Sequence, residues 1–172
     1  AIGVFVIPMS EEFGWSRTTI SVAGAMGVLV NGLTQPFLGM LFDRHGKKVI
    51  LAGLAAVGLT TIALSLTFHI IFLVFMFGIV ASTALSGAST INTWALLSRW
   101  FRRRRATVLG LNASGTSFGA IILVPFASYF MAATGSWRAT WAVLGLIVLW
   151  GLPFAWMFLH DNPAKKGLQP DG

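Results

Sequence analysis

Reactive side chains are few in this sequence, and they are too widely spaced to build an active site. The histidines His45, His69 and His160 are far apart, the chain has no cysteine, and no pair of carboxylates is set for acid–base catalysis. Enzymes need clustered nucleophiles, carboxylates or metal ligands. The sequence therefore predicts no enzyme, no catalytic residue, no metal site and no cofactor.

The polar side chains that remain within apolar sequence are amides and hydroxyls, whose chemistry is hydrogen bonding. An amide that faces lipid costs free energy unless it is bonded, so we expect these groups to face a bundle interior or a wet cavity. Two roles fit them: contact with a small-molecule substrate, or hydrogen bonds between helices without substrate contact. The candidate residues are Asn31, Gln35, Ser86, Ser89, Asn92, Thr93, Asn112 and Thr116.

The elements that carry these residues are long and uncharged. Of the 172 residues, 56% are hydrophobic and 10% are charged, whereas about a quarter of the residues in a soluble domain carry charge. Several uncharged stretches reach the roughly 20 residues that a membrane helix needs. They run over Thr18–Leu41, Val49–Phe68, Ile70–Ser98, Ala106–Met131 and Thr140–Leu159. The sequence therefore predicts an all-α membrane protein.

The opening apolar run, Ala1–Met9, is too short to cross a bilayer. As a helix it would rise roughly 14 Å, and the hydrocarbon core is about 30 Å thick. We interpret it as part of a truncated first span, so that residues 1–160 form a six-helix bundle and residues 161–172 begin a central cytoplasmic loop. The apolar stretch from Val49 to Ser98 must fold back on itself, and we place its turn at Thr67–His69.

Basic residues predict the orientation of the bundle. Most Lys and Arg lie in loops on one side of the bilayer, and the other side holds only Arg17 and Arg138. The basic residues on the first side are Arg44, Lys47, Lys48, Arg99, Arg102, Arg103, Arg104, Arg105, Lys165 and Lys166. By the positive-inside rule, these loops and both ends of the completed bundle face the cytoplasm. The net charge of +7 thus reports topology in a lipid bilayer and does not indicate nucleic-acid binding.

Polarity differs between the spans. In the fourth span, Ser82, Ser86, Ser89 and Thr93 recur every three or four residues, which places them on one helical face. We expect that face to point inward. The last span has no Ser, Thr, Asn, Gln or charged side chain from Val143 to Leu159, and we expect it, like the third span, to face lipid.

The loop between the second and third spans carries the most specific motif, Gly39-Met-Leu-Phe-Asp43-Arg44-His-Gly46-Lys47-Lys48. An Asp at a helix C-terminus opposes the helix dipole. We therefore expect Asp43 to have a partner, either a basic side chain or the N-terminus of another helix. Gly39 would permit close helix approach, and Gly46 would supply a tight turn. Lys47 and Lys48 could equally serve only to fix topology.

The fifth span begins with a basic run and continues with small residues. The run Trp100–Arg105 is typical of a topology determinant, and binding of anionic lipid is the alternative. Gly110, Gly115 and Gly119 follow, and the spacing of the last two would let a neighbouring helix pack closely.

The loop motif resembles the signature of the major facilitator superfamily, Gly-x-x-x-Asp-Arg-x-Gly-Arg-Lys, with Lys47 in place of the arginine. This resemblance implies the N-terminal six-span half of a transporter, whose partner is a C-terminal six-span half. It also implies that Asp43 and Arg44 belong to a cytoplasmic gate between the halves, and that the fifth span moves against the other half.

Two further segments resemble the bacterial oxalate/formate antiporter and monocarboxylate-porter branch. One is Gly3–Ser21, with Glu12-Phe13-Gly14-Trp15-Ser16-Arg17, and the other is the tail Asp161-x-Pro163-x-x-x-Gly167-Leu168-x-Pro170-Asp171-Gly172. The branch implies secondary transport of a small organic anion, such as a monocarboxylate, oxalate or formate, across the bacterial inner membrane.

The composition of the spans indicates where the partner of a carboxylate substrate can lie. No Asp, Glu, Lys, Arg or His lies inside a span, so the cation that would pair with a carboxylate is expected in the other half or in the rest of the first span. A transporter of drugs or sugars, and a stand-alone six-span assembly module, are the alternatives.

Overall fold

The computed structural model describes residues 3–161, and every element in that range is a helix. The helices are α1 (Gly3–Phe13), α2 (Arg17–His45), α3 (Lys47–Leu64), α4 (Ile70–Leu73), the π-helix η1 (Val74–Ala81), α5 (Ser82–Gly87), α6 (Thr90–Trp100), α7 (Arg105–Thr134) and α8 (Trp137–Phe158). The predictions for residues 162–172, including Lys165, Lys166 and the tail motif, concern residues outside the described range.

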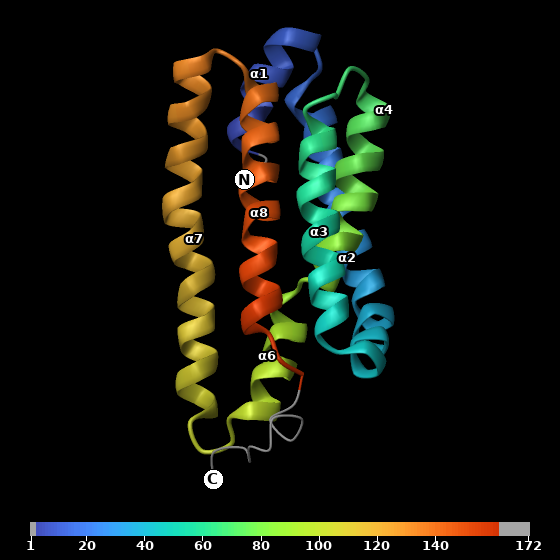
Figure 1. Ribbon diagram of the computed structural model, residues 1–172. Coiled ribbons are helices and arrows are strands. Elements are labelled where there is room, and N and C mark those ends of the chain that lie inside the picture. The colour runs from blue at the N-terminus through green and yellow to red at the C-terminus, as the bar shows by residue number, and fades with distance from the viewer. Residues whose placement is uncertain (1–2, 162–172) are drawn as a thin grey trace.

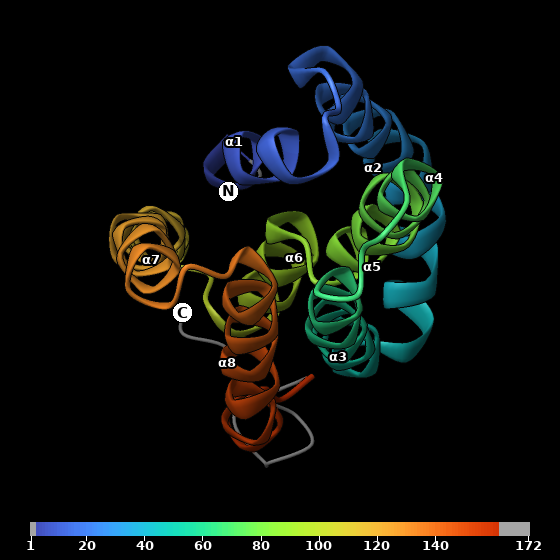
Figure 2. The same cartoon turned by 90° about the horizontal axis from the view of Figure 1, so that it is seen from above.

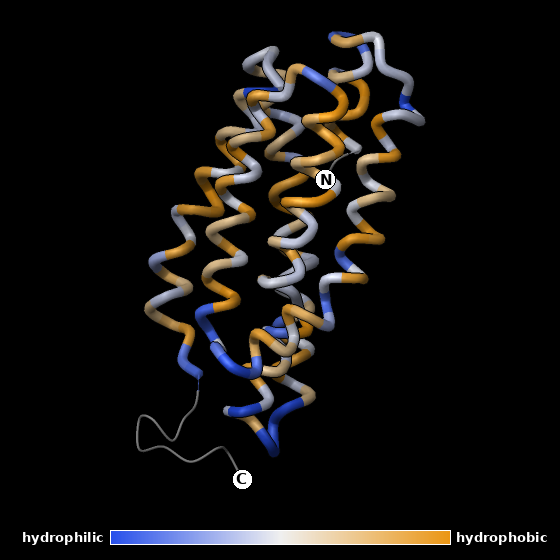
Figure 3. The backbone as a smooth tube through the Cα atoms, turned by 90° about the vertical axis from the view of Figure 1, so that its right-hand side faces the viewer, coloured by the Kyte–Doolittle hydropathy of each residue, from blue (hydrophilic) through white to orange (hydrophobic). Residues whose placement is uncertain are grey.

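Within the described residues, five helical segments are long and apolar enough to cross a membrane: α2, α3, the run Ile70–Trp100, α7 and α8. The prediction of five full spans after a short opening helix is therefore confirmed. The spans stand side by side (Figure 1). Viewed from above, they form a ring in the order α1, α2, the fourth span, α3, α8 and α7, with α6 turned toward the centre (Figure 2). Hydrophilic positions collect mainly at the two ends of the bundle (Figure 3).

The chain folds back between the third and fourth spans where the sequence predicts. Helix α3 ends at Leu64 and α4 begins at Ile70. The hydroxyl of Thr67 donates to the Leu64 carbonyl at 2.7 Å, and the His69 ring accepts from the Ile71 N–H at 3.3 Å. Side chains thus bond the backbone groups that the two helix ends leave free.

The fourth span is not one continuous α-helix, which corrects the prediction for Ile70–Ser98. It is wound as a π-helix over Val74–Ala81, and it breaks at Ala88 and Ser89 before α6. Ser89 has extended backbone and its hydroxyl accepts from the Asn92 N–H at 3.3 Å, as an N-cap does. A serine hydroxyl can lie on a buried helix face or cap a helix N-terminus. The regular spacing of serines in the sequence therefore does not reveal where the helix breaks.

Close helix packing uses other glycines than those the sequence analysis selected. A Cβ at Gly39, Gly110, Gly115 or Gly119 would meet nothing within 4 Å. By contrast, a Cβ at Gly145 would lie 2.7 Å from the Gly58 carbonyl oxygen, and one at Gly53 would lie 2.9 Å from that of Ala84. Helix α3 packs between α8 and the fourth span, and 33% of the residues in its spanning segment are buried, compared with 11% for α8. The expectation that α3 faces lipid is therefore wrong.

Most of the buried apolar residues between residues 3 and 161 form two clusters, one toward each end of the bundle. The larger contains Phe5, Met9, Ile20, Ala23, Leu64, Leu73, Trp137 and Trp141. The smaller contains Phe42, Val49, Ile50 and Leu96. The polar contacts described next lie at the two ends of the bundle and between α2 and the fourth span.

Candidate functional site

The basic end of the bundle, residues 43–48, 99–105 and 159–161, contains the predicted gating loop. The Asp43 carboxylate lies 3.7 Å from the Arg99 guanidinium, which also stacks over the Phe42 ring at 5.0 Å from its centroid. The expected partner of Asp43 is thus a basic side chain, supplied by α6. The Asp43 side chain is 78% exposed, and such pairs contribute only about 0–1 kcal/mol to stability. The pair is suited to breaking and re-forming.

Gly46 makes the tight turn that the sequence predicts. Its φ of 56° lies in the left-handed region that favours glycine, and its N–H donates to the Phe42 carbonyl at 2.7 Å. Helix α2 therefore ends there, and α3 starts at the next residue. Arg44 and Lys48 flank this turn with exposed side chains.

A contact that the sequence analysis missed joins the end of the sixth span to this loop. Asp161 Oδ1 accepts a hydrogen bond from the Lys47 backbone N–H at the start of α3. The Lys47 ammonium donates to the Leu159 carbonyl at 3.0 Å and lies 5.7 Å from the centroid of the Trp156 ring. A carboxylate at a helix N-terminus is favoured by the helix dipole. Lys47 and Asp161 therefore hold the gating loop against α8.

A polar network between α2 and the fourth span contains several of the predicted cavity residues. Asn31 Nδ2 donates to the Ser82 carbonyl at 3.1 Å and to Ser86 Oγ at 2.8 Å. Gln35 Nε2 donates to Ser89 Oγ at 2.9 Å. Thr34, which the sequence analysis did not select, lies with its hydroxyl 2.9 Å from Ser86 Oγ. The serine face of the fourth span thus points inward, toward the amides of α2.

Asn92 bonds across the break in the fourth span. Its side chain is 1% exposed, and its amide donates to the carbonyls of Ser86 at 3.2 Å and of Gly87 at 2.9 Å. The Thr93 hydroxyl donates to the Ser89 carbonyl at 3.1 Å. Asn92 therefore satisfies carbonyls that the end of α5 would leave unbonded.

The structure does not bring Asn112 and Thr116 into this network. Both lie on α7, where they line a separate open cavity of about 590 Å³ with Leu97, Val108, Leu111 and Gly115. A different cavity, of about 530 Å³, lies among α2, α3, the fourth span and α8, and Asn31 and Ser82 are two of its polar lining residues. The predicted candidates thus divide between two places in the bundle.

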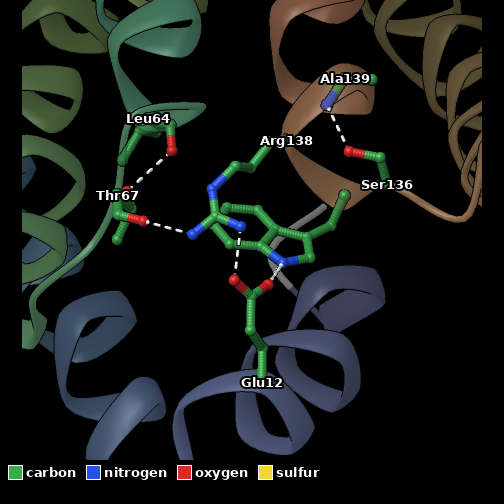
Figure 4. Close-up of polar contacts among 7 residues, drawn as sticks. Glu12, Leu64, Thr67, Ser136, Arg138 and Ala139 are labelled. Carbon is green, nitrogen blue, oxygen red and sulfur yellow. Dashed lines mark hydrogen bonds and ion pairs between the residues drawn. The ribbon is translucent and has the colours of Figure 1, made fainter.

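The opposite end of the bundle holds an ionic cluster that the sequence analysis also missed (Figure 4). Glu12 accepts from Trp137 Nε1 and, at 2.5 Å, from the Arg138 guanidinium, which donates at 3.1 Å to the Thr67 carbonyl. The cluster joins α1, the turn after α3 and the start of α8. Glu12 lies outside the five spanning helices, and the hydrogen bond from Arg138 lowers the pKa of its carboxyl. Trp137 is buried in this cluster.

Comparison with known proteins agrees with this architecture. The chain is 28% identical over 152 residues to monocarboxylate transporter 14 of Homo sapiens, covering 87% of the chain and 29% of that protein. It is 23% identical over 145 residues to the uncharacterized MFS-type transporter YcxA of Bacillus subtilis (strain 168), covering 84% of the chain and 35% of that protein.

A plant relative has a comparable sequence identity to the chain. The probable anion transporter 3, chloroplastic, of Arabidopsis thaliana is 28% identical over 128 residues, covering 70% of the chain and 24% of that protein. The chain thus spans about a third or less of the length of these relatives. The family model of the Major Facilitator Superfamily matches residues 1–172. The chain belongs to the major facilitator superfamily of membrane transporters.

Proposed function

We propose that the chain forms the first six-span bundle of a secondary transporter that moves a small organic anion by alternating access. The observation that carries the proposal is the open cavity of about 530 Å³ among α2, α3, the fourth span and α8, because Asn31 lines it and also bonds the fourth span. Small-molecule sites typically measure roughly 300–1,000 Å³ and combine apolar walls with a few polar groups. Binding of a substrate in this cavity would therefore change the contact between α2 and the fourth span.

Contacts at the two ends of the bundle also support transport by alternating access. At the basic end, the Asp43–Arg99 pair is exposed and weak, while Lys47 and Asp161 hold the loop to α8. At the opposite end, Glu12, Trp137 and Arg138 join α1 to α8. This arrangement suits a bundle that rocks as one body against a second six-span half, with the Asp43 loop as the gate on the cytoplasmic side.

The substrate class rests on the relatives. A monocarboxylate transporter and a probable anion transporter are both similar to this chain, and the name of each refers to an anion. The positive-inside rule supports placing the basic loops on the cytoplasmic side, and we propose that the membrane is the plasma membrane.

Ligand-induced stabilisation of the full transporter in detergent tests this class. A ligand that binds the folded state raises its stability by mass action, by about 2.7 kcal/mol at one hundred times its Kd. We expect lactate, pyruvate, formate or oxalate to raise the melting temperature, with sugars and hydrophobic drug cations as controls. Stabilisation by a sugar or a drug cation alone would contradict the organic-anion class and leave the fold intact.

A further inference from the structure

An open groove of about 620 Å³ lies between α2, α3 and the fourth span, which stand next to one another around the ring (Figure 2). The described residues that line it all come from these three spans, and several of them, such as Leu41, Ala52 and Ile79, are exposed. The groove shares no lining residue with the cavity of about 530 Å³. It is therefore a surface feature that is separate from the proposed substrate site.

The walls of the groove are apolar, and its deepest part consists of small residues. Leu38 on α2 and Ala56 on α3 are two of the apolar wall residues. Gly53 and Gly87 are buried where α3 meets the fourth span, and a Cβ at Gly87 would lie 3.3 Å from the Gly53 Cα. The close approach of two spans at glycines thus leaves a narrow apolar channel along the outside of the bundle.

The ionisable residues among those that line the groove, His45 and Lys48, both lie at the Gly46 turn. His45 Nδ1 lies 3.2 Å from the Leu41 carbonyl oxygen, which can only accept, so this nitrogen already donates to its own helix. Lys48 is exposed, and the ion pairs between described residues involve other cations. Within residues 3–161, the Lys48 ammonium is thus a cation without an anionic partner, placed at one end of the apolar groove.

The length of the groove matches one leaflet of a bilayer. From Lys48 to Ala56, α3 rises about 12 Å, and both residues line the groove. Half of the hydrocarbon core is about 15 Å thick. Because Lys48 lies at the basic end of the bundle, the groove extends from the level of the head groups through most of one leaflet. This is the path that the acyl chain of a phospholipid takes.

We propose that the groove binds one acyl chain of an anionic phospholipid, and that Lys48 pairs with the phosphate of its head group. Net negative charge selects the lipid, because Arg44 is exposed on the same turn and each basic residue near an anionic surface contributes about fivefold in affinity. The lipid alternative raised for Trp100–Arg105 concerns a different part of the basic end. The site is also independent of which solute the transporter carries.

Lipid titration of the full transporter in detergent, followed by native mass spectrometry, tests this ligand. We expect phosphatidylglycerol to bind at least about fivefold more tightly than phosphatidylcholine with the same acyl chains. Glycerol 3-phosphate, which carries the phosphate without a chain, should not displace the lipid. Equal affinity for the two lipids would contradict selection by charge, and displacement by glycerol 3-phosphate would contradict binding of the chain.

Lys48→Gln removes the cation at the end of the groove. We expect it to weaken phosphatidylglycerol binding about fivefold. Arg105→Gln is the matched control, because it removes one exposed charge at the same end of the bundle, outside the groove. It should change the affinity by less than about twofold. Equal weakening by the two variants would show diffuse attraction to the basic end and would overturn the site.

Filling the groove gives an independent test, which also decides the matter if Lys48→Gln does not reach the membrane. Ala52 lines the groove at an exposed position on α3, whereas Ala25 is exposed on α2 outside it. We expect Ala52→Phe to lose the bound phosphatidylglycerol and Ala25→Phe to retain it. Retention by Ala52→Phe would overturn the proposal. If Ala52→Phe also changed the oligomeric mass, the groove would instead be an interface between two copies of the chain.

Discussion

The carboxylate of Asp43 lies 3.7 Å from the guanidinium of Arg99, and this ion pair joins the last turn of α2 to the last turn of α6. It is exposed and therefore weak. In an alternating-access cycle, such a pair biases the closed state without locking it. Removal of the pair should therefore lower the transport rate and hardly change the free energy of unfolding.

Asp43→Asn is therefore expected to lower the transport rate by up to about fivefold, because a pair that contributes about 1 kcal/mol or less shifts an equilibrium between two states by no more than that factor. The free energy of unfolding should change by less than about 1 kcal/mol. Initial rates in proteoliposomes and thermal unfolding in detergent measure the two effects. Glu11→Gln, at an exposed carboxyl near the opposite end, is the control. A transport rate equal to that of the wild type would remove Asp43 from the gate.

Asp161→Ala should destabilise the bundle, because it removes the carboxylate that caps α3 at the Lys47 N–H. Loss of an N-terminal capping group typically costs about 1 kcal/mol. We expect Asp161→Asn to lose less, since an amide oxygen still accepts the hydrogen bond but lacks the charge that the helix dipole favours. Thermal melting in detergent ranks the three proteins. Equal melting temperatures for Asp161→Ala and the wild type would show that the contact carries no stability.

Glu12→Gln tests the cluster at the opposite end of the bundle. Because Arg138 lowers the pKa of Glu12 in the folded protein, the ionised carboxyl stabilises the fold at neutral pH. That contribution is lost as the pH falls through the lowered pKa, below the ordinary range of a glutamate. The stability difference between wild type and Glu12→Gln should therefore be present at pH 7 and vanish in strong acid. A difference that is constant with pH would contradict an ionic role for Glu12.

Gly145→Ala tests the close contact between α3 and α8. The new Cβ would lie 2.7 Å from the Gly58 carbonyl oxygen and 2.8 Å from the Ile62 nitrogen, so the helices must separate. Overpacking of this kind typically costs about 1–3 kcal/mol. Gly119→Ala, at a position on α7 with nothing within 4 Å, is the matched control. If both variants melt at the wild-type temperature, the α3–α8 contact is looser than described.

The spans and the turn near Thr67 were predictable because bilayer thickness limits how long an apolar segment can run before it folds back. That Asp43 would have a partner was also predictable, since a carboxylate at a helix C-terminus needs a cation or a helix N-terminus. The identity of that partner, Arg99, was not, because it depends on where the break at Ser89 directs α6.

Contacts between distant segments escaped the sequence analysis for a related reason. Lys47 meets Asp161, and Glu12 meets Arg138, across most of the chain, and no local pattern reports such pairs. The glycines show the same limit. Gly110, Gly115 and Gly119 follow a packing pattern yet have open space above them, whereas Gly58 and Gly145 touch. Spacing indicates which helix faces can pack closely, and only the fold determines which of them meet.

Transport by the full chain that contains this bundle is the most direct test of the proposed function. The measurement is uptake of labelled lactate, pyruvate, formate and oxalate into proteoliposomes, with and without the same unlabelled anion inside. We predict saturable uptake of a monocarboxylate that is absent from protein-free liposomes and weakened by Asp43→Asn. Uptake that rises linearly with concentration and equals that of protein-free liposomes for every one of these anions would contradict transport of a small organic anion.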